Sequence, residues 1–160
     1  MKFSRRCFEI NEIGYIEVKI SYEDYSYISD KIVESRILTS TRTRPVLINS
    51  EIEFIIPDWV YRIREDLVRC IDPLTGESYS YLENLEGSDL IKRLICLDRS
   101  VSLWYDTLKM AEESYKSLIS EDEMSPLRIK SILPLCTALE FTLHMDSEFF
   151  MDRIWTILEK

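Results

Sequence analysis

Glycine is scarce in this chain of 160 residues, which contains three. Phosphate loops of the P-loop and dinucleotide-binding types need several glycines at fixed spacing, so these two classes of site are excluded. Histidine is scarcer still, because His144 is the only one. Sites built from two or more imidazoles of one chain are therefore excluded as well. A serine triad would need a G-x-S-x-G turn to present its nucleophile, and the sequence has none.

Cysteines are few and far apart, and no C-x-x-C pair occurs. This spacing indicates neither a zinc site nor a disulfide framework. Free and mostly buried thiols are expected, because unpaired cysteine behaves as a small apolar residue. The four are Cys7, Cys70, Cys96 and Cys136.

Long apolar runs are also missing. No uninterrupted run approaches the ~20 residues that cross a bilayer, and the opening segment MKFSRRCFEINEIGYIEV lacks the apolar core of a signal peptide. We therefore expect no membrane partner and a cytoplasmic location.

Positive charge is in deficit. There are 20 Lys plus Arg against 29 Asp plus Glu, which gives a formal net charge of −9. An acidic surface repels a polyanion, so nonspecific nucleic-acid binding is not expected. Any phosphate must be bound locally. With 46% hydrophobic and 31% charged residues the chain has an ordinary globular composition, and we expect one domain.

Apolar residues alternate with polar ones in three segments, which is typical of strands with one buried face. Helical spacing occurs in others, and helix-capping residues precede two of these. Helices outnumber strands and no repeat is present, which predicts a single α+β domain with a mixed or antiparallel sheet. The predicted strands are 15–20, with Ile16, Val18 and Ile20 facing the core, then 45–56, and the segment of Leu139, Phe141 and Leu143. The predicted helices are 23–38, 59–68, 88–120, 125–133 after Ser125-Pro126, and a last helix capped by Asp146 or Ser147.

The strongest periodic signal runs from residue 88 to about 120, where apolar residues recur in steps of four and three. A helix of roughly 30 residues is about 45 Å long, more than one small core needs. Two interpretations are open: a central helix packed against its own chain, or one that also packs against a sister subunit. The second predicts a homo-oligomer with the helix near the subunit contacts. The residues are Leu90, Leu94, Leu97, Val101, Trp104, Leu108, Ala111, Tyr115 and Leu118.

A basic group lies between the first helix and the second strand. Arg36, Arg42 and Arg44 alternate there with hydroxyl residues, among them Thr39. Guanidinium forks and hydroxyls together suit a phosphate group. The other interpretation is a solvated loop or strand edge. We take this group as the candidate anion site.

Four segments follow a known order: Glu53 to Pro57, Tyr115 to Ile119, Ser125 to Leu135, and Phe141 to Asp146. In this order the chain resembles the flavin-dependent thymidylate synthases (ThyX). That family has an E-F-Y-I-P segment, a long helix, an A-R-x-x-L-P-L helix start and a strand ending in T-x-N-x-R. The resemblance extends from about residue 8 to 160 and rests mainly on apolar positions.

The chain departs from the family at its signature, R-H-R-x-x-S-x-N-E-x-S-x-R-Y. Without gaps, Glu34 to Arg36 fall on R-H-R and Thr39 falls on the serine; with a gap, Arg42 to Arg44 fall on R-H-R. Both placements stay open. His144 and Asp146 replace the Asn and Arg of T-x-N-x-R. An acidic residue in place of Arg turns attraction for phosphate into repulsion, worth ~1 kcal/mol at 4 Å in water and ~4 kcal/mol at an effective dielectric of 20.

The resemblance implies a single ThyX-like domain over residues 1–160, lacking the family's terminal extensions, with a long central helix and several shorter ones. It implies a homotetramer and adds Lys130, which stands at the family's arginine before L-P-L, to the phosphate site. Because the signature is degenerate, we expect a catalytically degenerate nucleotide-binding protein, which binds or sequesters a nucleotide in the former active-site pocket without a cofactor. The alternative is a flavin-dependent enzyme that uses FAD to methylate or hydroxymethylate a pyrimidine nucleotide at C5.

Overall fold

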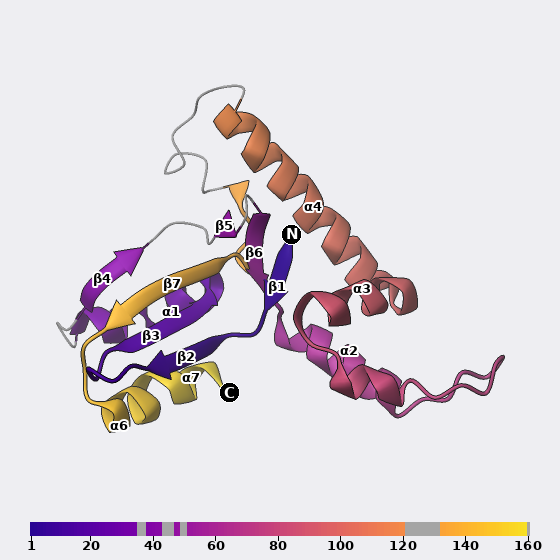
Figure 1. The fold of residues 1–160 in the computed structure, drawn as a ribbon, viewed down its shortest axis with the longest axis horizontal. Helices are drawn as coiled ribbons and strands as arrows, with labels where there is room; N and C mark the ends of the chain where they lie inside the picture. The colour runs from indigo at the N-terminus through magenta and orange to yellow at the C-terminus, as the bar shows by residue number, and fades with distance from the viewer. Residues whose placement is uncertain (35–37, 43–46, 49–50, 121–131, 160) are drawn as a thin grey trace.

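The structure, a computed structural model, describes residues 1–34, 38–42, 47–48, 51–120 and 132–159. Within these ranges the chain forms two small sheets and a set of helices, which confirms the α+β class (Figure 1). No helix in the described ranges has the length and apolar character needed to cross a membrane.

The larger sheet is antiparallel and has the strand order β2-β3-β7-β4. Its strands are β2 (Cys7–Ile10), β3 (Ile16–Ser21), β7 (Ala138–Leu143) and β4 (Leu38–Arg42). The alternation predicted for the second of these is confirmed, because Ile16, Val18 and Ile20 are buried while Glu17 is exposed.

The smaller sheet has the order β1-β6-β5 and mixes parallel with antiparallel pairing. Its strands are β1 (Lys2–Ser4), β6 (Glu51–Ile55) and β5 (Leu47–Ile48). The amide of Ile55 donates to the carbonyl of Cys136 at 2.7 Å, and Phe54 bridges to Thr137, so the start of β7 also contacts β6. The two sheets are thereby joined.

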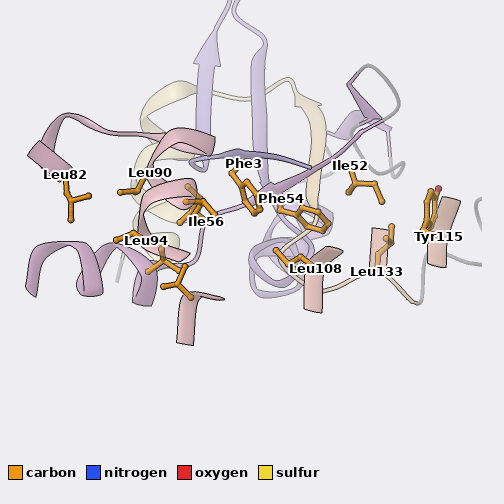
Figure 2. Close-up of a cluster of buried hydrophobic side chains, with 13 residues drawn as sticks. Phe3, Ile52, Phe54, Ile56, Leu82, Leu90, Leu94, Leu108, Tyr115 and Leu133 are labelled. Carbon is orange, nitrogen blue, oxygen red and sulfur yellow. The ribbon is translucent and has the colours of Figure 1, made fainter. Parts of the chain in front are cut away.

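Helices cover one face of each sheet. Against the smaller sheet lie α2 (Asp58–Val68), α3 (Gly87–Leu97) and α4 (Arg99–Ser120), with the short 3-10 helix η1 (Ser80–Asn84) against α2. Figure 2 shows Phe3 and Phe54 in the middle of the resulting core, with Leu108 beside them. Against the inner face of the larger sheet lie α1 (Tyr22–Glu34) and a C-terminal helix made of α6 (Ser147–Phe150), the π-helical turn η3 (Met151–Trp155) and α7 (Thr156–Leu158).

Local capping explains where two helices begin. The Ser21 hydroxyl accepts a hydrogen bond from the amide of Asp24 at 3.0 Å, and the Asp24 carboxylate accepts one from the amide of Ser21 at 3.3 Å, which is a capping box for α1. The Asp146 carboxylate accepts from the amide of Phe149 at 3.0 Å, so the predicted cap of the last helix is confirmed.

The prediction of one helix over residues 88–120 is wrong. Asp98 adopts an extended backbone between α3 and α4, and its carboxylate caps α4 by accepting from the amide of Val101 at 3.0 Å. The apolar seam runs through both helices and faces the core of its own chain, where Leu94, Leu108 and Tyr115 are buried. The seam therefore no longer argues for a subunit contact, and the homo-oligomer stays a prediction without that support.

Other boundaries also differ from the predictions. The first helix ends at Glu34 rather than near Leu38, which starts β4, a strand that the sequence pattern missed. The single strand over 45–56 is two strands, β5 and β6. The helix predicted from Ser125 lies outside the described residues up to residue 131. Three cysteines predicted to be buried are exposed, because they lie on outward faces or beyond a helix end: Cys7, Cys70 and Cys96.

Candidate functional site

The predicted phosphate-binding residues fall around β4. Arg36, Arg44 and Lys130 lie outside the described residues. Thr39 and Arg42 belong to β4, where the ladder shifts register between Leu38 and Ser40, and such irregularities often occur beside functional sites. The backbone register pairs Arg42 with Glu140 of β7. The described part of the candidate anion segment, β4, therefore lies at one edge of the larger sheet.

The outer face of this sheet has a shallow depression of about 450 Å³. The inner face packs against α1 and the C-terminal helix, whereas the depression lies on the side to which the polar residues of the alternating strands point. Small-ligand sites have volumes of roughly 300 to 1,000 Å³, so this one can hold a molecule of nucleoside size. Its walls come from β2, β3 and β7: Cys7, Glu9, Glu17, Val18, Lys19, Glu140, Phe141 and Thr142.

Lys19 lies in the depression and bridges two carboxylates. Its Nζ is 2.9 Å from Oε1 of Glu140 and 3.1 Å from Oε2 of Glu53, which reaches across from β6 and is 1% exposed. Burial by itself would lower the pKa of Lys19, but hydrogen bonds from Glu140 and Glu53 and their charges outweigh it and raise the pKa above its ordinary value of 10.5. Lys19 is therefore a fixed cation at neutral pH.

Cys7 is the Cα partner of Lys19 in the ladder between β2 and β3. Although the residue is exposed, burial of its thiol by the surrounding strands raises its pKa above the ordinary 9.0, and the Lys19 charge offsets only part of this effect. A nucleophilic cysteine needs a lowered pKa, and a nucleophilic lysine must lose its proton. Neither residue meets its condition, so neither Cys7 nor Lys19 is assigned as a nucleophile.

Metal binding has little support in this part of the molecule. No group of three or more His, Cys, Asp or Glu side chains with the geometry of a metal site occurs among the described residues. In the depression the carboxylate of Glu140 is already bound to an ammonium group. Glu9, Glu17 and Glu140 still outnumber Lys19, so the depression carries net negative charge.

The two residues that replace family positions at the end of β7 have local structural roles. His144 is exposed and its ring centroid lies 4.9 Å from that of Tyr15. Asp146 caps the C-terminal helix through its hydrogen bond to the Phe149 amide. The contacts of both side chains are explained without a bound ligand.

Sequence reasoning missed the residues of the depression, although part of the signal was present. In the two correctly predicted strands, β3 and β7, the polar residues that alternate with the core are Glu17 and Lys19 in one and Glu140 and Thr142 in the other. Assigning these four residues to the same outer face of one sheet would have identified part of the lining of the depression. The contribution of Glu53 had no such signal, because its strand belongs to the other sheet.

Comparison with protein-family models, with curated protein sequences and with solved structures finds no match to this chain. The functional argument therefore rests on the geometry above and on the residues of the sequence.

Proposed function

We propose that this chain is a catalytically degenerate, ThyX-like nucleotide-binding protein. In this proposal the phosphate is bound by the basic segment around β4, with Lys130, and the nucleoside lies in the adjoining depression. One observation carries it: the register of β4 against β7 pairs Arg42 with Glu140, which lines the depression. This pairing supports a phosphate at β4 with the nucleoside beside it in the depression.

The charges favour this orientation of a nucleotide over the reverse. Three carboxylates line the depression and its lysine is bound to two glutamates, so a phosphate placed there would be repelled. Repulsion between like charges 4 Å apart is about 4 kcal/mol at an effective dielectric of 20. Carboxylates are, however, good acceptors for sugar hydroxyls and base amino groups. The acidic end therefore suits the nucleoside and the arginine-rich segment suits the phosphate.

The described residues also favour binding over catalysis. The Cys7 thiol and the Lys19 ammonium are both held in their unreactive protonated forms. Asp146, which stands at the family's arginine in the T-x-N-x-R segment, is occupied as a helix cap. The alternative enzyme would need FAD, and we expect none to be retained.

Calorimetric titration with purine and pyrimidine nucleotides tests this proposal. We expect a nucleotide to bind, and the double variant R42A/R44A to bind it at least about tenfold more weakly, since each charge-assisted hydrogen bond is worth about 1.5 to 3 kcal/mol. The matched control is R62A/R69A, which removes two exposed arginines of and beyond α2 and should leave affinity unchanged.

Three results would contradict the proposal. They are the absence of binding by any nucleotide, an affinity that R42A/R44A leaves unchanged, and flavin absorbance in the purified protein at one equivalent per chain. The last would support the enzyme instead.

A further inference from the structure

The edge strand β2 is open to another strand. It pairs with β3 on one side, and in the described ranges no strand pairs with its other side. Cys7, Glu9 and Ile10 are exposed along it. Figure 1 shows β2 at the margin of the larger sheet, and the strand order places it at the opposite edge from β4. An unpaired edge carries a row of free backbone donors and acceptors, which is how extended peptides dock by strand addition.

The face beside this edge has an unfavourable charge arrangement. Glu9 and Glu17 are direct Cα partners in the antiparallel ladder, and both are exposed. Like charges in opposite positions on neighbouring strands destabilise a sheet. Among the described residues neither carboxylate takes part in an ion pair, and Lys19, two residues from Glu17, is bound to Glu53 and Glu140. A cation brought to this face from outside would relieve the repulsion.

We propose that β2 and the Glu9–Glu17 face dock an extended basic segment of a partner protein. The segment would add as a strand to β2, about as long as its four residues, and place alternate Lys or Arg side chains over the carboxylates, because residues i and i+2 of a strand share a face. A second copy of this chain is disfavoured as the occupant, since its own β2 would bring another Glu9 to an acidic face of a chain with net charge −9.

This inference does not depend on nucleotide binding. The nucleotide proposal places the phosphate along β4, at the other edge of the sheet, but its nucleoside would lie in the depression, whose lining includes Glu9 and Glu17. E9Q/E17Q therefore bears on both proposals, whereas R42A/R44A should weaken nucleotide binding and leave peptide binding unchanged. Loss of one activity with retention of the other separates the two proposals.

Fluorescence anisotropy with a labelled peptide of alternating lysine and valine tests the docking site. We expect saturable binding that weakens as ionic strength rises, and a loss of at least about tenfold in affinity in E9Q/E17Q. The control E77Q/E113Q removes two exposed carboxylates elsewhere and should bind as the wild type does. A peptide with N-methyl groups at alternate residues on its pairing edge should not bind, because it keeps the charge but cannot form the backbone hydrogen bonds.

The isosteric E9Q/E17Q variant should also unfold at a higher temperature than the wild type, because it removes the repulsion between the two carboxylates. Weaker peptide binding together with greater stability is a combination that a damaged fold does not produce. Equal affinity of E9Q/E17Q and the control, or undiminished binding of the N-methylated peptide, would overturn the proposal, as would failure of the unmodified peptide to bind at low ionic strength.

Discussion

Replacing Lys19 by Met tests the link between the two sheets. The substitution keeps most of the aliphatic length but leaves the Glu53 carboxylate, 1% exposed, without its ammonium partner at 3.1 Å. Removing one partner of a fully buried ion pair costs about 3 to 5 kcal/mol. Since the Lys19 side chain is 23% exposed and water can reach it, we expect about 2 to 3 kcal/mol, which is roughly a 30- to 160-fold change in the unfolding equilibrium constant.

Urea denaturation of K19M, E53Q and the double variant measures this loss at neutral pH. The control is K92M, which breaks the pair of Lys92 with Asp89, whose side chains are 72% and 75% exposed, and it should change stability by less than about 0.5 kcal/mol. A K19M protein as stable as K92M, or a double-mutant cycle with no coupling between positions 19 and 53, would refute the reasoning.

The difference in unfolding stability between the wild type and K19M should change with pH in a defined direction. The pKa of Lys19 is raised in the folded state, so its contribution to stability is fully present below its ordinary value of 10.5 and is lost as pH rises through the folded pKa. The stability difference between wild type and K19M should therefore stay constant near neutral pH and become smaller above about pH 10.5.

Two further predictions concern the packing. Gly87 has φ +54°, and a Cβ added there would lie 2.8 Å from the Phe3 carbonyl oxygen. At Gly76 φ is +72° but the space is open, so G76A should cost only about 1 to 2 kcal/mol of backbone strain. G87A should therefore destabilise the fold by clearly more than G76A, and equal denaturation midpoints of the two variants would contradict this. Burial raises the pKa of Cys136 to about 12. A thiol reagent at pH 8 should therefore modify the exposed Cys70 and Cys96 at once, Cys7 more slowly because burial of its thiol raises its pKa, and Cys136 only after unfolding. Immediate modification of all four cysteines would contradict the structure.

Elements that depend on local patterns were predicted well. The alternation of Ile16, Val18 and Ile20 defines one buried face whatever the strand pairs with, and the helix over 59–68 agrees with α2. The cap at Asp146 needs only its own carboxylate and the amide of Phe149. These features are determined by neighbours along the chain, which a single sequence displays directly.

Features that depend on an interruption within a regular apolar pattern, or on pairing between segments far apart in the sequence, were not predicted. The heptad spacing of apolar residues continues across Asp98. The chain nevertheless starts a new helix there, because the Asp98 carboxylate accepts a hydrogen bond from the Val101 amide. An Asp followed by Arg and Ser inside an apolar seam is the signal that could have indicated the break. The strand β4 is polar and lacks alternation; it is a strand because β7, about a hundred residues later, supplies its partner.

The difference between what neighbours along the chain determine and what the folded structure determines also decides which positive charges on this acidic chain are available to a ligand. A sequence count treats every lysine and arginine as a possible phosphate ligand, but among the described residues the structure engages several of them in ion pairs with carboxylates. These are Arg5 with Glu86, Arg6 with Asp24 and Asp58, Lys19 with Glu53 and Glu140, Lys92 with Asp89, and Lys116 with Glu112. A phosphate competing for any of them must displace a carboxylate. Each such pairing lowers the number of cations open to a ligand among the described residues. Arg62 and Arg69, exposed residues of and beyond α2, take part in none of these pairs, so they are the arginines against which the segment around β4 has to be compared when nucleotide binding is measured.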